Sequence, residues 1–217
     1  AWLTLDQQGS GTNTLGTEVM GQLDARLAEI WRARPRALVI RSAKDSGFIA
    51  GADISEFTGF ADAEQAYRLV RTGQQVFDRI EALPMPTAAA IHGFALDGGL
   101  ELALACDYRV GADEGRLNLG LPEVLLGIHP GFGGTVRTPR LIGAPAALDL
   151  MLTGRSLRGD AALKLGLIDR LVPREGLDSA AREIVLAAPA PRRAPLMLRL
   201  LGLPLLRSFV AAQTRKQ

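Results

Sequence analysis

The chain has 217 residues, of which 47% are hydrophobic and 22% are charged, and its formal net charge is +2. These values are typical of a soluble globular protein with a large core, and the length predicts one domain or one domain with a small appendage. The 25 basic residues barely outnumber the 23 acidic ones and do not cluster, which argues against nucleic-acid binding.

The single cysteine, Cys106, excludes an intramolecular disulfide framework and fits a reducing compartment. It lies in an apolar run, so we expect a buried side chain rather than a nucleophile. No apolar run reaches the roughly 20 residues of a membrane span and no signal peptide is recognisable, so we expect a cytoplasmic protein. The chain opens on Ala1 inside a strand pattern, and we expect its natural N-terminus to lie upstream.

Short apolar runs alternate with longer helical patterns in the first part of the chain. The runs predict strands at residues 1–5, 37–42, 87–93 and 107–112. Apolar residues at helical spacing predict helices over 17–34 and 63–83, and the second helix ends at the "PMP" of residues 84–86. This alternation predicts an α/β fold with a mostly buried sheet.

From about residue 144 onward the pattern is mainly helical. Helices are expected over 144–154, 157–166, 177–188 and 196–217, with one short strand candidate at 167–172 and a Pro/Arg-rich break at 188–195. The chain therefore divides into an α/β core over residues 1–190 and a helical extension over 191–217.

The first candidate ligand loop, "SGFIAGADISEF", runs from Ser46 to Phe57 and follows a predicted strand. Open α/β sheets place ligand sites at such loops, and the small residues of "AGAD" let a ligand approach the backbone. The alternative is a plain turn followed by a helix that Asp53 caps.

The second loop, "FALDGG", leads into a helix that we expect to begin near Gly98. Free N–H groups at a helix start stabilise negative charge, and glycines let a ligand oxygen reach them, as an oxyanion requires. The alternative role of Gly98 and Gly99 is tight packing between helix and strand. The spacing does not match a dinucleotide-binding fingerprint.

Glu101 follows this turn and is the lone acid of an otherwise apolar helix. A buried carboxylate costs several kcal/mol unless it has a partner, or else its pKa rises. A structural glutamate is more stable on a solvated face, so this position favours a functional role.

The third loop spans residues 119–143 and holds a second isolated acid. Pro122 suits the first position of a helical turn, which places Glu123 in that first turn. Two such carboxylates lining one pocket are a common means of adding and removing protons. His92 and His129 have no triad or metal-ligand spacing, so we expect structural or solvent-facing roles for both, and no metal site.

Together, "FIAGADISEF", "IHGFALDGGLELALACDYRV" and "LGLPEVLLGIHPGFGGTVRTPRLIG" resemble the signature segments of the crotonase superfamily, the enoyl-CoA hydratase/isomerase fold. "GADISEF", "GFGGTVRTPRLIG" and "ALKLGLIDRLVP" are most similar to the N-terminal half of multifunctional fatty-acid-oxidation α-subunits. The resemblance extends over residues 1–190.

This resemblance implies a stacked ββα spiral core with a C-terminal helical region, and an acyl-CoA thioester as substrate. It implies Glu101 and Glu123 as catalytic residues, and the backbone N–H groups of Ala52 and Gly98 as the oxyanion hole. Further substrate-binding positions implied by the resemblance are Ala50, Gly51, Asp53, Ile54, Gly99, Pro130 and Gly131. No cofactor is expected for hydration, because coenzyme A is part of the substrate.

The implied activity is addition of water to a trans-2-enoyl-CoA in fatty-acid β-oxidation, with Glu101 activating the water and Glu123 protonating the α-carbon. One alternative is a Δ3,Δ2-enoyl-CoA isomerase, which depends mostly on Glu123. Another is a non-catalytic acyl-CoA-binding module. The resemblance also implies either a homotrimer or hexamer, or a thiolase partner.

Two residues depart from the family pattern. Asp97 replaces the first glycine of the usual triple-glycine turn and places a carboxylate beside the expected oxyanion, so we expect it to tune or weaken catalysis. Ser55 stands where many monofunctional hydratases have lysine, which puts a phosphate contact there in doubt. The segment "LLRSFVAAQTRKQ" resembles the helix that leads into a dehydrogenase half, so we expect an excised domain or a fragment.

Overall fold

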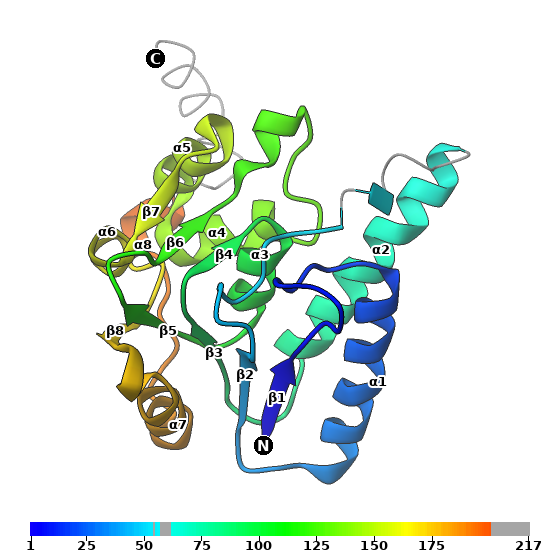
Figure 1. The fold of residues 1–217 in the computed structure, drawn as a ribbon. Coiled ribbons are helices and arrows are strands. Elements are labelled where there is room, and N and C mark those ends of the chain that lie inside the picture. Colours follow the sequence, from blue (N-terminus) through cyan, green and yellow to red (C-terminus); the bar gives the residue numbers. More distant parts are fainter. Residues whose placement is uncertain (54, 57–61, 201–217) are drawn as a thin grey trace.

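The computed structural model describes residues 1–53, 55–56 and 62–200 of the chain (Figure 1). Its main sheet is parallel, with the strand order β1-β2-β3-β5-β8. These strands are β1 (Trp2–Leu5), β2 (Leu38–Ser42), β3 (Thr87–Ile91), β5 (Tyr108–Asp113) and β8 (Arg170–Pro173). All five lie where the apolar runs predict strands.

A second, three-stranded sheet was not predicted from the sequence. It has the order β4-β6-β7, with β4 parallel to β6 and β6 antiparallel to β7. The strands are β4 (Phe94–Leu96), β6 (Asn118–Gly120) and β7 (Ser156–Arg158). Three residues are too few to show an alternating pattern, which explains the omission. The helix expected over 157–166 was wrong at its start, because 156–158 form β7.

Eight α-helices are described in these parts of the chain, and most coincide with the periodic segments. They are α1 (Thr17–Ala33), α2 (Ala63–Glu81), α3 (Gly98–Ala105), α4 (Gly134–Ile142), α5 (Ala144–Thr153), α6 (Gly159–Leu165), α7 (Leu177–Ala187) and α8 (Leu196–Leu200). Two short 3-10 helices, η2 (Pro122–Leu126) and η3 (Arg174–Gly176), complete the described elements. None of the described helices is long and apolar enough to cross a bilayer.

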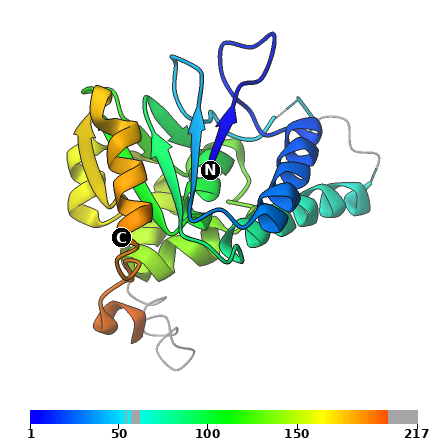
Figure 2. The ribbon, with the colours of Figure 1, turned by 90° about the horizontal axis from the view of Figure 1, so that it is seen from below.

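The main sheet has apolar residues on both faces. On one face α7 packs against strand residues such as Ala88, Ala90 and Val110. The other face joins the larger core, in which α3 is buried along its whole length. In both views α1 and α2 lie side by side at one end of the molecule, and α7 lies toward the other (Figure 1, Figure 2). Cys106 is buried, as expected from its apolar surroundings.

The expected C-terminal extension begins after α7. Ala194 is buried and its N–H donates to the Arg140 carbonyl at 3.0 Å, and α8 contacts α4 and α5. Residues 201–217 lie outside the described residues. The boundary at residue 190 therefore stays a prediction.

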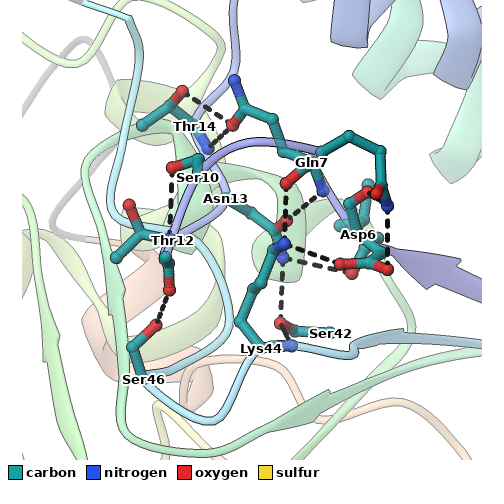
Figure 3. Close-up of polar contacts among 12 residues, drawn as sticks. Asp6, Gln7, Ser10, Thr12, Asn13, Thr14, Ser42, Lys44 and Ser46 are labelled. Carbon is teal, nitrogen blue, oxygen red and sulfur yellow. Dashed lines mark hydrogen bonds and ion pairs between the residues drawn. The ribbon is translucent and has the colours of Figure 1, made fainter.

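A buried asparagine ties the loop after β1 to the loop after β2 (Figure 3). Asn13 Nδ2 lies within hydrogen-bond distance of Leu5 O (3.2 Å), Ser42 Oγ (2.9 Å) and Phe48 O (3.1 Å). Its own carbonyl accepts from the Ala50 N–H at 2.9 Å. Asn13 therefore holds the backbone that runs from β2 toward Ala52.

Lys44 adds an ionic contact to the same junction (Figure 3). Its Nζ donates to Gln7 O and pairs with Asp6 Oδ1, both at 2.6 Å. The pair with Asp6 lowers the pKa of that carboxyl. Because Asp6 is largely solvated, this pair is expected to contribute little to stability.

The Asn13→Ala variant should unfold more readily, because it leaves buried acceptors without their donor. We expect the free energy of unfolding, measured by urea denaturation, to fall by about 2 kcal/mol. Gln8→Ala is the matched control, since the hydrogen bonds of Gln8 to described residues are exposed ones to Asp6. If both variants shift the unfolding midpoint equally, Asn13 does not organise this junction.

Candidate active site

The loop after β2 runs directly alongside β4 and the start of α3. Phe48 N–H donates to Phe94 O at 2.9 Å, and Leu96 N–H donates to Ile49 O at 3.2 Å. A Cβ on Gly99 would lie 2.5 Å from Ile49 O, so no side chain fits there. Gly99 therefore has a packing role, and its contact with substrate stays a prediction.

The same loop also pairs with the chain just before α1. Leu15 N–H donates to Gly51 O at 2.9 Å, and Asp53 N–H donates to Leu15 O at 3.2 Å. Gly51 has a φ of 139°, which favours glycine. These contacts fix the peptide of Ala52, whose N–H points toward the residue that precedes α3.

That residue is Asp97, and its carboxylate receives both N–H groups that were expected to form the oxyanion hole. Gly98 N–H donates to Oδ1 at 2.5 Å and Ala52 N–H donates to Oδ2 at 3.4 Å. The two amides therefore converge on one place, although they lie 45 residues apart. Burial raises the pKa of Asp97, and the two hydrogen bonds oppose that rise.

The backbone of Asp97 is in a conformation that suits glycine. Its φ is 52° and its ψ is −132°. Such sparsely populated conformations cost a residue other than glycine about 1–3 kcal/mol. Asp97, which replaces a glycine of the family pattern, thus has a backbone conformation typical of glycine.

Glu101 lies on the buried helix α3 and is fully inaccessible to solvent. Its Oε1 accepts from Phe132 N–H at 2.9 Å and Gly134 N–H at 2.6 Å, at the N-terminus of α4. Its Oε2 has no hydrogen-bond partner among the described residues. Burial raises the pKa of Glu101 to about 7, against the opposing effect of the two amides and of Arg137.

Glu123 lies in the first turn of η2, directly after Pro122, as the sequence predicts. Its side chain is buried, and neither carboxylate oxygen has a hydrogen-bond partner in the described part of the chain. Burial, followed by the nearby carboxylates of Asp97 and Glu101, raises the pKa of Glu123 to about 8.

The structure brings Asp97, Glu101 and Glu123 together. One carboxylate oxygen from each lies within 4.8 Å of the other two. Glu101 and Glu123 thus share one small site, and their raised pKa values suit proton exchange near neutral pH. These oxygens are also close enough to share a cation, so the expectation of a metal-free site remains a prediction.

Arg137 of α4 supports this site and was missed from the sequence. Its buried guanidinium donates to Phe132 O at 2.9 Å, and to Glu81 and Asp78 on α2 at 2.9 and 2.6 Å. It thereby fixes the loop whose amides hold Glu101. A basic residue one turn into a predicted helix gave no signal of this role.

The amides of Phe132 and Gly134 were missed as well. A Cβ on Gly134 would lie 2.9 Å from Glu101 Oε1, so this glycine allows the carboxylate to approach the helix start. The "FGG" before a predicted helix was the available signal, because free amides at a helix N-terminus attract carboxylates.

The remaining predicted residues border the site or lie apart from it. Pro130 is buried against the Gly134 position, and Gly131 O accepts from Gln74 Nε2 at 2.8 Å. Asp53 Oδ1 accepts from the Ser55 N–H at 3.0 Å, whereas its expected role as a helix cap stays a prediction. Ile54 lies outside the described residues. The substrate contacts of these positions stay predictions.

The two histidines take no part in the carboxylate cluster. His92 is buried, with Nε2 2.6 Å from Lys44 O. His129 is exposed, and its Nδ1 lies 3.1 Å from Pro130 O. Both placements agree with the structural or solvent-facing roles expected from the sequence.

A cavity of about 250 Å³ lies between the start of α1 and α2, and Phe132 also lines it. Leu15, Met20, Leu69 and Phe132 supply much of its apolar lining. Leu15 and Phe132 also border Gly98, since a Cβ there would lie 3.1 Å from each. The cavity and Gly98 therefore share two bordering side chains, Leu15 and Phe132.

Comparison with known proteins places these features in a family. Residues 3–200 match the family described as enoyl-CoA hydratase/isomerase. The fatty acid oxidation complex subunits alpha of Aliivibrio fischeri and Shewanella loihica are 47% and 46% identical to the whole chain. The chain covers 32% and 31% of these proteins, so it spans about a third of the length of these curated relatives.

Solved structures show the same fold. An enoyl-CoA hydratase from Bacillus anthracis superposes with a TM-score of 0.79 and 37% identity, covering 88% of this chain and 73% of that protein. One from Mycobacterium smegmatis gives a TM-score of 0.78 and 26% identity, covering 85% and 70%. The crotonase-like α/β fold expected from the sequence is confirmed, and the chain belongs to the enoyl-CoA hydratase/isomerase family.

Proposed function

We propose that this chain adds water to a trans-2-enoyl-CoA thioester and forms the 3-hydroxyacyl-CoA, a step of fatty-acid β-oxidation. The observation that carries the proposal is the pair of buried carboxyls, Glu101 and Glu123, beside the point where two backbone amides converge. Family membership supports the substrate class. The coenzyme A moiety enters with the substrate, so the proposal needs no separate cofactor.

In this mechanism the N–H groups of Ala52 and Gly98 bind the thioester oxygen. When water adds at the β-carbon, electrons move through the α-carbon to that oxygen and leave it negatively charged. Each fixed donor to such an oxyanion contributes about 10²–10³ in rate in other enzymes. The donors of this chain come from two rigid loops, which fixes their direction before substrate arrives.

Two proton transfers complete the reaction. The water oxygen bonds to the β-carbon while one of its protons passes to Glu101, and Glu123 gives its proton to the α-carbon. The product gains the elements of water, and proton exchange between the two carboxyls and solvent restores their starting states.

The environments of the two carboxyls favour this division of roles. Glu101 is held by two amides and lies near Arg137, which oppose the effect of burial and leave its pKa at about 7. Glu123 lies beside two other acids, and its pKa is about 8. The group with the lower pKa suits the base and the group with the higher pKa suits the acid.

The cavity between α1 and α2 is the candidate site for the acyl chain, because Leu15 and Phe132 line it and also border Gly98, whose N–H binds the thioester oxygen in the proposed mechanism. The named relatives are subunits of a fatty acid oxidation complex, which supports a multisubunit assembly. The thiolase partner, the alternative trimer or hexamer, and the cytoplasmic location stay proposals.

Glu101→Gln and Glu123→Gln should each reduce hydration of crotonyl-CoA by about 10²–10⁴ in kcat, because each removes one proton-transfer group. The loss of enoyl-thioester absorbance measures the rate. Glu29→Gln is the control, since Glu29 is exposed on α1 and pairs only with Arg26 among the described contacts.

The same variants separate the alternatives. A Δ3,Δ2-enoyl-CoA isomerase should retain most activity in Glu101→Gln and lose it in Glu123→Gln. A non-catalytic module should bind crotonyl-CoA without turnover in any variant. Hydration that survives both substitutions would disprove the proposed mechanism.

The pH dependence of kcat/KM for hydration should be bell-shaped, with apparent pKa values near 7 and 8. Below the first value Glu101 is protonated and cannot accept a proton from water. Above the second Glu123 has lost the proton that it must donate. Initial rates with crotonyl-CoA from pH 5 to 10 test this, and a flat profile across that range would contradict the assignment.

A further inference from the structure

The Asp97 side chain occupies the place that the proposed mechanism gives to the thioester oxygen. Its two carboxylate oxygens take the N–H groups of Gly98 and Ala52, at 2.5 and 3.4 Å. These are the same two donors that the substrate oxygen requires. The carboxylate and a bound thioester oxygen cannot both hold them.

The contacts of Asp97 differ from those of an ordinary helix cap. A capping side chain accepts from the second or third amide of its helix. Asp97 instead accepts from Gly98, the first residue of α3, and from Ala52 on a different loop. The side chain thus bridges the two walls of the oxyanion hole rather than closing the helix.

Several features make aspartate unfavourable at this position. Its φ of 52° favours glycine, and its carboxylate lies within 4.8 Å of oxygens of Glu101 and Glu123. The Asp97 side chain fits here only because residue 51 is glycine, since a Cβ on Gly51 would lie 3.0 Å from both Cβ and Oδ2 of Asp97. Glycine in place of Asp97 would remove both the backbone strain and the added carboxylate.

We propose that the Asp97 carboxylate is an internal anion bound in the oxyanion hole, and that an acyl-CoA binds productively only after this side chain leaves the two amides. The proposal rests on the function proposed above. It makes Asp97 an autoinhibitory residue that competes with the carbonyl oxygen of the substrate. Rotation about the Cα–Cβ bond of Asp97 is the motion that frees the two amides.

Competition for the amides has a specific signature in binding. A thioester has the competing carbonyl oxygen, whereas a thioether of the same length lacks it. Removing the carboxylate should therefore strengthen binding of the thioester alone. A general effect of charge or folding would alter the binding of both ligands.

The test compares butyryl-CoA, which has no double bond to hydrate, with the thioether S-butyl-CoA by isothermal titration calorimetry on the whole chain. Asp97→Gly should bind butyryl-CoA about tenfold more tightly than the unchanged protein, the effect of one or two recovered hydrogen bonds. Its affinity for S-butyl-CoA should stay within about twofold. Crotonyl-CoA hydration should rise in kcat/KM by the same factor as butyryl-CoA affinity.

Asp97→Asn is the matched variant, since it removes the charge but keeps one side-chain oxygen that can accept from an amide. Its gain in affinity for butyryl-CoA, relative to the unchanged protein, should be smaller than the gain of Asp97→Gly. Asp97→Ala repeats the test with the Cβ retained. A thermal unfolding midpoint at or above that of the unchanged protein shows that each variant is folded.

Two results would overturn this proposal and leave the proposed function intact. One is equal butyryl-CoA affinity in the unchanged protein and Asp97→Gly, with S-butyl-CoA still bound. The other is an equal gain in affinity of Asp97→Gly for the thioester butyryl-CoA and for the thioether S-butyl-CoA. If neither protein binds any of these CoA compounds, the proposed function fails and this proposal fails with it.

Discussion

The site depends on how closely the loop after β2 approaches the turn that begins α3. Ile49 O lies against Gly99 with no room for a side chain, and the backbone of this loop bonds to both ends of β4. Asn13 holds the same loop from the other side through Phe48 O and the Ala50 N–H. Backbone bonded on two sides cannot shift far, so Ala52 and Gly98 present their amides to the two oxygens of one carboxylate, that of Asp97.

A second constraint gives the two glutamates different chemistry within one small volume. Both are buried, so both pKa values rise. Glu101 also receives two amides from the start of α4, and Arg137 holds the loop that carries them. Glu123 has no comparable donor among the described residues. Differences in hydrogen bonding and in neighbouring charges therefore separate an apparent base from an apparent acid.

Much of this site follows from single residues and their neighbours. Glu101 in an apolar helix and Glu123 behind a helix-starting proline are visible as anomalies in the sequence, and the structure brings them together. The partners of Glu101 are harder to predict from the sequence. The backbone amides that bind it, and Arg137, come near it only because residues 130–137 fold back toward α3. The strands β4, β6 and β7 escaped notice since three residues cannot display a period. Local patterns thus predict which residues are unusual, whereas the contacts between them require the fold.

Asp97 lies between the two parts of the site, the backbone amides of Ala52 and Gly98 and the carboxyl groups of Glu101 and Glu123. Amides that converge on one point favour an anion there, whether substrate or side chain. Burial disfavours that anion and raises the pKa of Asp97, whereas the neighbouring Glu123 carboxyl lowers this pKa and favours the anion. In the unliganded chain Asp97 satisfies the amides and also raises the pKa values of Glu101 and Glu123. Its departure from the amides would therefore change hydrogen bonding and proton affinity together, which couples binding of the thioester oxygen to the protonation of the two acids.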